Sequence, residues 1–447
     1  MLEMIALPVL ALGAGLLGVY QSHRSFRLNG QAVASSCGLQ VEETSDFWSG
    51  GLSFKARAGP IRVQIFGPRR KGHGPQLVVV APWPLDFSGV RIRPELEKPF
   101  GAREVEIGDD AFDSAFYIVG STRLLLALLD AETRRLMIAA NTGHDSLQIV
   151  GGELRAEAFY PQMTGVLRCL LEIARRFSQP LDIAESLAAN ARQDPNPEVR
   201  LRNLLFLVRE LPGNPATEAL RAACSDASPK VRLRAAKELG AEARGTLLEL
   251  AESPEDDAIA AQAIWSLRRD LPLERARAIL IQALRRRRLQ TAHACLERLG
   301  HRAAAEDVDT LAKVITRENS ELAAAAAHVL GGAGHPAAEP PLIAALHHER
   351  TDVRLAAAKA LGRAGSAAAV LPLKEAAERS PRDQDLLRAT RQSIAEIKSR
   401  LQGASPGQLS LAGAEAGKLS LAETEAGQLS LAEEQGRELS LPENLVS

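Results

Sequence analysis

Four histidines in the last third of the chain, His328, His335, His347 and His348, are the residues best suited to bind a metal, and Glu349 stands beside the last two. Histidine nitrogens and carboxylate oxygens are ligands for zinc and iron. An H-E-x-x-H site places its two histidines on one helix face, whereas adjacent residues on a helix point about 100° apart. The spacing therefore favours separate histidines at the surface or between helices, and we expect no metal-binding residue.

Carboxylates gather in a second place, where Asp109, Asp110 and Asp113 follow Gly108. A calcium loop needs the ordered pattern D-x-[DN]-x-[DN]-G, which this stretch lacks. Acidic residues after a glycine are common in turns. The sequence therefore favours a turn over a metal site here.

Gly13, Gly15 and Gly18 spell G-x-G-x-x-G after an apolar run, which is the spacing of a dinucleotide-binding turn. That fingerprint also needs an amphipathic helix, a second strand and an acidic residue about twenty positions on, and Glu42 comes too late for it. The stretch 413–419 resembles a phosphate loop, but it is one residue short and ends in Leu. The four cysteines lack C-x-x-C spacing, which indicates reduced thiols. We therefore expect no catalytic residue, no cofactor-binding residue, no cofactor and no enzyme activity.

A run of four arginines, Arg285–Arg288, offers charge for phosphate contacts, and more arginines stand nearby: Arg275, Arg277, Arg298 and Arg302. Aromatic residues that would stack on bases do not interleave the run. The net charge of −1 gives no global attraction for nucleic acid. A short arginine run at a helix end is usually solvated or pairs with the helix C-terminus, so nucleic acid is the disfavoured alternative.

These residues belong to a repeating pattern that must position them. Anchor positions recur at intervals of 32, 28, 32, 31, 31 and 33 residues, at Val199, Val231, Ile259, Thr291, Leu322, Val353 and Leu386. A period in this range is typical of a solenoid of helix pairs. In the copy 231–239 the apolar residues fall at i, i+4 and i+8, which predicts a helix, and Ser228-Pro229 suits its start.

The stretches 215–225 and 340–347 predict the other helix of their pairs. Glycines close several copies, and we expect them to form left-handed C-terminal caps: Gly240, Gly300, Gly331 and Gly362. Arginines recur after the anchors, and we expect them to bind carboxylates and carbonyls of the adjoining repeat: Arg200, Arg232 and Arg354.

The pattern Asp/Pro-x-Val-Arg-x-x-Ala-Ala-x-x-Leu-Gly, clearest in 228–240 and 351–362, resembles a HEAT repeat in the variant of phycobilin-lyase-like bacterial proteins. The resemblance covers about half of the chain. It implies an α-solenoid whose second helices line a concave face that binds other macromolecules. It implies no activity, because fold and function separate easily.

The run Met4–Tyr20 is uncharged and mostly apolar, and as a helix it would span roughly 26 Å, the short edge of what a bilayer requires. Arg24 and Arg27 follow it, which predicts that the chain after it stays in the cytoplasm. From Ser25 to about Val150, short alternating runs broken by Gly and Pro predict strands at 52–56, 61–66, 77–80 and 90–93, a helix at 121–137, and a hairpin through Gly151-Gly152.

The end of the chain repeats Leu-Ser-Leu every ten residues. Residues 403–447 hold seven Glu against Lys418 and Arg437, which gives −5 and leaves about +4 for residues 1–402. Ten helical residues turn about 1000°, so the Leu pairs would not share a helix face. The composition predicts a disordered tail, and strand addition to a partner is its functional alternative.

The sequence thus predicts a mainly α fold: a HEAT-type α-solenoid preceded by a transmembrane helix and a small α+β domain, with a disordered tail. The expected boundaries are 1–20 for the anchor, 21–160 for the α+β domain, 161–181 for a connecting helix, 182–402 for the solenoid and 403–447 for the tail. The expected protein is a single-pass scaffold of the bacterial inner (cytoplasmic) membrane that binds a protein partner on its solenoid groove. Candidate partner-binding residues are Arg202, Arg234, Lys237, Lys359 and Arg363. The alternatives are a lyase-like, cofactor-handling protein and, further behind, a nucleic-acid-binding HEAT protein.

Overall fold

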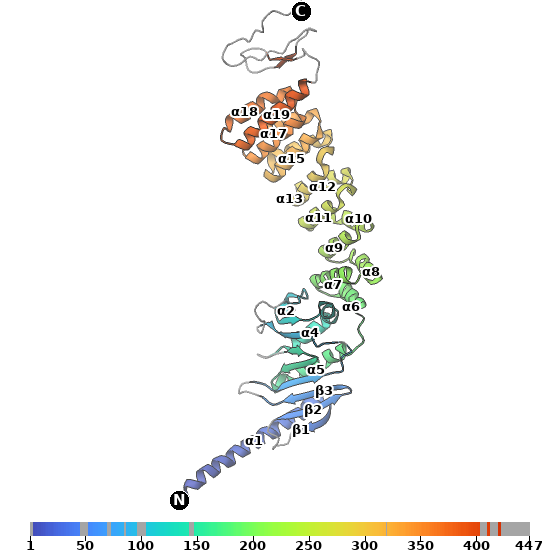
Figure 1. Ribbon diagram of the computed structural model, residues 1–447, viewed down its shortest axis with the longest axis vertical. Coiled ribbons are helices and arrows are strands. Elements are labelled where there is room, and N and C mark those ends of the chain that lie inside the picture. The colour runs from blue at the N-terminus through green and yellow to red at the C-terminus, as the bar shows by residue number, and fades with distance from the viewer. Residues whose placement is uncertain are drawn as a thin grey trace, which may run out of the picture. The chain divides into compact units, whose positions relative to one another are not determined.

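The computed structural model describes residues 3–44, 52–68, 73–84, 86–95, 104–142, 147–318, 320–402, 409–411 and 419–421. Side chains are described from residue 20 onward, except at 320, at 402 and in the last two stretches. The chain divides into two compact units, residues 1–239 and 240–447. Where described, the first unit holds an antiparallel sheet, its covering helices and two helix pairs, and the second holds five further pairs (Figure 1).

The described sheet of the first unit has the strand order β1-β2-β3-β4-β8-β7-β5-β6, and every neighbouring pair is antiparallel. The strands are β1 (Gln40–Thr44), β2 (Ser53–Ala58), β3 (Ile61–Phe66), β4 (Gln76–Val80), β5 (Arg91–Pro94), β6 (Phe116–Val119), β7 (Gln148–Val150) and β8 (Glu153–Glu157). The four predicted strands correspond to β2 to β5. The predicted hairpin is β7–β8, and Gly151 and Gly152 make its turn with φ of 58° and 84°, which glycine adopts without strain.

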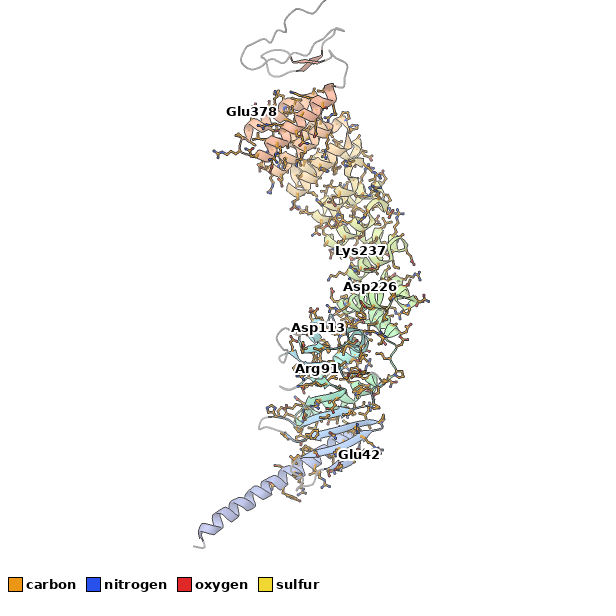
Figure 2. All side chains as sticks on the ribbon, in the orientation of Figure 1. Glu42, Arg91, Asp113, Asp226, Lys237 and Glu378 are labelled. Atoms are coloured by element: carbon orange, nitrogen blue, oxygen red, sulfur yellow. The ribbon has the colours of Figure 1, made fainter. Side chains whose placement is uncertain are left out.

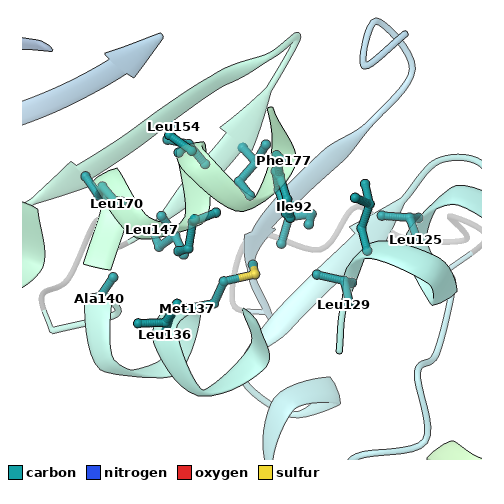
Figure 3. Packing of buried hydrophobic residues seen from close by; sticks show 14 of the residues in the cluster. Ile92, Leu125, Leu129, Leu136, Met137, Ala140, Leu147, Leu154, Leu170 and Phe177 are labelled. Carbon is teal, nitrogen blue, oxygen red and sulfur yellow. The ribbon is translucent and has the colours of Figure 1, made fainter. Parts of the chain in front are cut away.

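Helices cover this sheet: α1 (Glu3–Ser36), α2 (Asp110–Asp113), α3 (Thr122–Leu128), α4 (Ala131–Ala140) and α5 (Tyr160–Phe177). Helix α5 packs against β3, β4, β8 and α4. Figure 3 shows Leu154, Ile92, Met137 and Phe177 converging from strands and helices in this core. The single helix predicted at 121–137 is wrong, because Asp130 accepts a hydrogen bond from the Thr133 N–H and starts α4 as a separate helix.

Helix α1 continues well past the predicted anchor, and Phe26, Val33 and Ala34 are buried where its last part packs on β1, β2 and α5. The backbone of Gly13–Gly18 is helical, so the strand–turn–helix frame of a dinucleotide site is not formed there. Among the residues that the structure describes, no helix combines the length and the apolar character needed to cross a membrane. The side chains of residues 3–19, on which the anchor rests, lie outside the described part, so the anchor stays a prediction without structural support.

Seven helix pairs follow in the described chain, and the second helix of each carries one predicted anchor. All seven anchors are buried, which confirms the predicted period. The pairs of the first unit are α6 (Ile183–Gln193) with α7 (Pro197–Glu210), and α8 (Asn214–Ala223) with α9 (Pro229–Leu239).

The pairs of the second unit are α10 (Arg244–Glu252) with α11 (Asp257–Leu267), α12 (Leu273–Arg285) with α13 (Leu289–Leu299), α14 (Val308–Arg317) with α15 (Ser320–Ala333), α16 (Glu339–Ala345) with α17 (Thr351–Ala364), and α18 (Val370–Arg379) with α19 (Gln384–Gln402). Within this unit each second helix packs against the next one, from α11 to α19. A single pair cannot bury its apolar face, and stacking provides the missing cover.

The arginine after the anchor closes the turn before its own helix. In three copies its Nη1 donates to the carbonyl oxygens six and five residues back, at 2.7 to 3.2 Å: Arg200, Arg232 and Arg354. Arg200 also donates two hydrogen bonds of 2.6 and 2.7 Å to the carboxylate of Asp226. Asp226, labelled in Figure 2, lies in the turn before α9. The expected contact with the adjoining repeat is therefore made by Arg200, whereas the bonds described for Arg232 and Arg354 stay within their own turns.

The glycines near the ends of the second helices have two different roles. Gly240 and Gly300 have positive φ of 61° and 45°, which glycine adopts without strain, but the ψ of −129° at Gly300 is not that of the predicted left-handed cap. The same prediction is wrong for Gly331 and Gly362, which lie inside α15 and α17. A Cβ at Gly331 would overlap the Cβ of Ala360, and one at Gly362 would lie 2.6 Å from Ser393 Oγ. These two glycines are required by the close approach of neighbouring second helices.

The sheet domain and the first helix pairs share one hydrophobic core. Arg134 on α4 is only 2% exposed, and its guanidinium binds both carboxylate oxygens of Asp194 at 2.9 and 3.1 Å and Asp109 at 2.8 Å. Asn190 on α6 donates to the carbonyl oxygen of Leu126 on α3 at 2.9 Å. The first helix pair is therefore covered by the sheet domain, as the end of a repeat stack requires.

Two Leu-Ser-Leu copies of the tail form strands, β9 (Leu409–Leu411) and β10 (Leu419–Leu421). They pair antiparallel, with Ser410 opposite Ser420. The rest of the tail that was predicted to be disordered lies outside the described residues.

Candidate interaction surface

Within each unit, the exposed side of the second helices is the candidate site. Six positions after each buried anchor stands a residue turned about 240° from it, since each helical residue adds about 100°. We call these seven residues the surface row: Leu205, Lys237, Trp265, Glu297, His328, Lys359 and Gln392. All except the half-buried Leu205 are exposed, so the row is open to a partner.

In the second unit the surface row borders a hollow of about 410 Å³ at the C-terminal ends of α11 and α13, which we call the Arg268 hollow. Trp265 is 43% exposed there, and its indole Nε1 donates to Glu297 Oε2 at 2.6 Å. Tryptophan and arginine are the residues most enriched at the centres of protein interfaces. The polar and aromatic lining consists of Trp265, Arg268, Arg269, Glu297, Arg298, His301 and Arg302.

The Arg268 hollow carries an excess of positive charge, with four arginines and one carboxylate in its lining. Arg298 donates from Nε to the carbonyl oxygen of Leu271 at 2.9 Å, so its guanidinium is fixed in place. Burial, and then the charges of Arg302 and Arg269, lower the pKa of Arg298. An anionic group would relieve this repulsion, because guanidinium groups bind carboxylate and phosphate in a planar, bidentate manner.

Arg268 itself has a backbone that arginine rarely adopts, with φ of 47°. In neighbouring copies the residue after the closing leucine is a glycine, Gly240 or Gly300, with φ of 61° or 45°. With its ψ of −117°, this sparsely populated conformation costs a residue that has a side chain about 1–3 kcal/mol. The chain therefore places a guanidinium at the hollow at a position where glycine would be easier to accommodate.

A line of side chains continues from this hollow along the second helices. The rings of His301 and His328 lie 6.4 Å apart, and His328 Nδ1 is 3.1 Å from Arg363 Nη2. Burial, and then the charges of Arg363 and His301, lower the pKa of His328. A neutral His328 can accept the hydrogen bond from Arg363. One of the predicted partner-binding residues, Arg363, is thereby connected to the lining of the hollow.

The first unit has a hollow of its own, about 460 Å³, beside α7, which we call the Arg202 hollow. Arg202 donates to the carbonyl oxygen of Glu106 at 2.6 Å and to its carboxylate at 3.1 Å. Leu205 and Phe206 supply apolar lining. Arg202 thus links the solenoid to the sheet domain, and it also borders a space that a partner could fill.

The other predicted residues lie apart from these contacts. Arg234 forms an ion pair of 2.8 Å with Glu238 on the same helix. Lys237 on α9, labelled in Figure 2, and Lys359 on α17 are exposed members of the surface row. The structure places all five predicted residues on second helices, in three different neighbourhoods. Their role in binding a partner stays a prediction.

The histidines of the alternative metal site have separate partners. His335 Nδ1 accepts from the Ala337 N–H at 3.2 Å, and His348 Nδ1 accepts from the Arg350 N–H at 3.1 Å. His347 lies beside Arg379. Within the described part of the chain, no three His, Cys, Asp or Glu residues are grouped to hold a metal ion.

The aspartates after Gly108 also have structural partners. Asp113 accepts from the Ile107 and Gly108 N–H groups at 3.0 and 2.8 Å, and Asp109 binds Arg134. These contacts agree with the turn that the sequence favours. Among the thiols, burial raises the pKa of Cys295 to about 12, which leaves it a poor nucleophile.

The arginine run does not form a continuous basic stripe. Arg288 is buried and donates to the Ser253 carbonyl oxygen at 2.7 Å. Arg277 is held by Asp307 at 2.9 Å and by Glu274 at 2.7 Å, and Arg275 lies 3.4 Å from Glu252. Of the eight arginines that the nucleic-acid alternative relies on, Arg275 and Arg277 are thus paired with carboxylates and Arg288 is removed from the surface.

Sequence reasoning named Arg298 and Arg302 only as part of the basic stretch, and it did not connect them with Trp265. The position of Trp265 within its repeat could have indicated that it is exposed. It stands six positions after the anchor Ile259, as Lys237 and Lys359 do after their own anchors. The backbone of Arg268 gives no signal in the sequence, apart from the glycines at the matching positions 240 and 300.

Comparison with protein families agrees with this architecture. A family model described as HEAT repeats matches residues 308–395, which span α14 to most of α19. The match and the helix pairs support a HEAT-repeat protein with a solenoid-like arrangement of helices. They do not support the phycobilin-lyase-like variant.

No curated protein matches the chain. Similar solved structures include human deoxyhypusine hydroxylase, which is 20% identical over 48% of this chain and 96% of that one, with a TM-score of 0.21. An engineered protein is 18% identical over 51% of this chain and 91% of that one, with a TM-score of 0.20. At these TM-scores the two similarities carry no argument about function.

Proposed function

We propose that this protein is a non-catalytic scaffold that binds a protein partner along the surface row, on the concave face that a HEAT solenoid implies. The observation that carries the proposal is the Arg268 hollow, where an exposed indole and four guanidinium groups converge on stacked helices. Residues held on rigid helices lose little freedom on binding, which favours affinity. The HEAT match supports a helical repeat scaffold of this kind.

Capture experiments with the full chain test the surface row. Trp265→Ser and Arg363→Glu together change two exposed side chains of second helices, and we expect the amount of captured partner to fall at least tenfold. That loss is about 1.4 kcal/mol, a modest effect for an interface hot spot. Captured proteins would be quantified by mass spectrometry at equal bait.

Two exposed apolar residues of first helices provide the matched control. Ile281 on α12 and Leu371 on α18 are 40% and 38% exposed, close to the 43% of Trp265. Ile281→Ser with Leu371→Ser should leave capture unchanged. Equal loss in both double variants, or no loss in either, would remove the surface row from the function.

The proposal includes a membrane tether through residues 1–20, with the bulk of the chain in the cytoplasm. Its support is the uncharged apolar run 4–20 and the arginines that follow it. Sedimentation of lysed cells tests it: the full chain should pellet with membranes and be released by detergent. A chain that stays in the high-speed supernatant without detergent contradicts the tether.

The lyase-like, cofactor-handling alternative would be favoured by a pocket of histidine and cysteine with shifted ionisation. The Arg268 and Arg202 hollows are lined mainly by Arg, Glu, Leu, Phe and Trp, and of their lining residues His301 alone is a histidine. This lining suits a protein surface better than a cofactor. The scaffold is therefore the function that we propose.

A further inference from the structure

The Arg268 hollow combines three features that the fold does not require. Arg268 occupies a position of positive φ that glycine fills in neighbouring copies. Arg269 and Arg302 add positive charge beside Arg298, although Glu297 is the only carboxylate in the lining. Trp265 stays 43% exposed at the edge of the hollow, with its indole Nε1 held by Glu297. Together they describe a site for a negatively charged segment with an apolar side chain.

The chain supplies such a segment itself. Residues 423–443 hold six Glu against Arg437, a net charge of −5, and Leu residues stand between the Glu groups. A second acidic run, Glu255–Asp257, lies in the second unit itself, but two of its carboxylates have structural roles: Asp256 caps α11 and Asp257 accepts hydrogen bonds from Thr291. The net charges of hollow and segment are therefore complementary.

The segment is long enough to reach the hollow. Four helix steps separate α19 from α11, which is about 40 Å at up to 10 Å per packed pair. With β9 and β10 paired, the eighteen residues 403–408 and 422–433 remain to span that distance, and extended chain covers about 60 Å. The pair Glu433 and Glu434 can therefore arrive at the arginines without displacing the β9–β10 pairing.

We propose that the Arg268 hollow binds the acidic segment 423–443 of this chain. Carboxylates of the segment bind the guanidinium groups of Arg268, Arg269 and Arg302, and a leucine side chain covers the indole of Trp265. This contact goes beyond the proposed scaffold function. It makes the tail a built-in competitor for any partner that uses the same part of the surface row.

The test uses the full chain and follows acrylamide quenching of Trp265 fluorescence, with the Trp265→Phe chain subtracted to remove the other tryptophans. One variant replaces the six glutamates of residues 423–443 by glutamine, and another is Arg268→Gly. In low salt we expect either variant to raise the quenching constant at least twofold. Combining them should add nothing further, and high salt should bring the wild-type chain to the same value.

Arg287→Gly is the matched control, because Arg287 also has a positive φ, of 55°, and does not line the hollow. Both glycine variants should unfold at the same temperature as the wild type or higher, and only Arg268→Gly should expose Trp265. Equal quenching in the wild-type and glutamine-tail chains at low salt would overturn the proposal. So would a rise in quenching in Arg287→Gly that matches Arg268→Gly.

A second arm adds the peptide 423–443 to the glutamine-tail chain. We expect saturable protection of Trp265 that disappears in Arg268→Gly and with a peptide in which glutamine replaces glutamate. Absence of binding in this arm also contradicts the proposal. The scaffold function has a separate readout in the glutamine-tail chain, where the tail no longer competes. There, Trp265→Ser with Arg363→Glu should still reduce partner capture, whether or not the native tail binds the hollow.

Discussion

At the scale of single residues, His328 shows how the stack tunes a side chain that titrates near neutral pH. Its imidazole lies among groups that carry or can carry positive charge, Arg363 and His301, and it is partly removed from water. These surroundings lower its pKa, so the folded chain favours neutral His328 more than the unfolded chain does.

The sign of the pH dependence follows from this direction. The contribution of neutral His328 to stability is fully present above the ordinary histidine pKa of about 6.5, and it is lost as pH falls through the lower folded-state pKa. His328→Asn keeps an acceptor for Arg363 and does not titrate. We expect the wild-type thermal midpoint to fall relative to that variant between pH 7.5 and 5. Parallel curves for the two chains would contradict this account.

At the scale of helices, close packing of α15 on α17 depends on the missing side chain of Gly331. A Cβ there would overlap the Cβ of Ala360, so Gly331→Ala must push two second helices apart. Overpacking of this kind costs about 1–3 kcal/mol. We expect the second unit to unfold at correspondingly lower urea concentration, as measured by circular dichroism.

Gly245 in α10 provides the comparison for that prediction. A Cβ at Gly245 meets nothing within 4 Å, so Gly245→Ala gains helix propensity without a clash. It should stabilise the second unit by roughly 0.5–1 kcal/mol. Two alanine substitutions in helices of one unit are thus expected to act in opposite directions. A stabilising Gly331→Ala would show that the helices can separate freely.

The elements also show which parts of the fold the sequence could predict. The anchors from Val199 to Leu386 could be found because every second helix buries the residue at this position. Their spacing is kept even in copies whose other residues differ. Gly331 could not be distinguished from Gly300, because a close contact between helices and a positive φ both select glycine. Strand β1 was not predicted, because its side chains are exposed and nearly all polar and give no alternating apolar pattern.

The candidate site was less predictable than the fold. Lys237, Lys359 and Arg363 could be proposed because an exposed charge at a fixed position of a repeat is visible in the sequence. The Arg268 hollow brings together residues about thirty positions apart, and one of them needs a backbone conformation that composition does not reveal. Such a site becomes visible only when neighbouring helices are placed side by side.

At the scale of the molecule, Arg134 ties the sheet domain to the first helix pair. Burial acts to lower its pKa, but Asp194 and Asp109 more than offset that effect, so its pKa is raised and it stays charged. Arg134→Met would leave Asp194 buried without its partner, which costs about 3–5 kcal/mol. We expect faster hydrogen exchange in α4 and α6, read by mass spectrometry, because two units need not unfold in one step.

Arg135 is the neighbouring control for this prediction. It is exposed and pairs with Glu132 one turn away, and exposed pairs of this kind contribute little to stability because water screens them. Arg135→Met should therefore leave exchange in α6 unchanged. Similar effects of the two substitutions would mean that the buried ion pair does not hold the junction.

The arginine-closed turns have a consequence for how such a chain can change over generations. Arg200, Arg232 and Arg354 each satisfy carbonyl groups of the turn that belongs to their own helix. A gene segment encoding one whole pair carries both the turn and its guanidinium, so unequal crossing-over inserts or removes a complete module. The solenoid can thereby lengthen or shorten in whole periods without exposing unsatisfied carbonyls, while the sheet domain continues to cover its first pair.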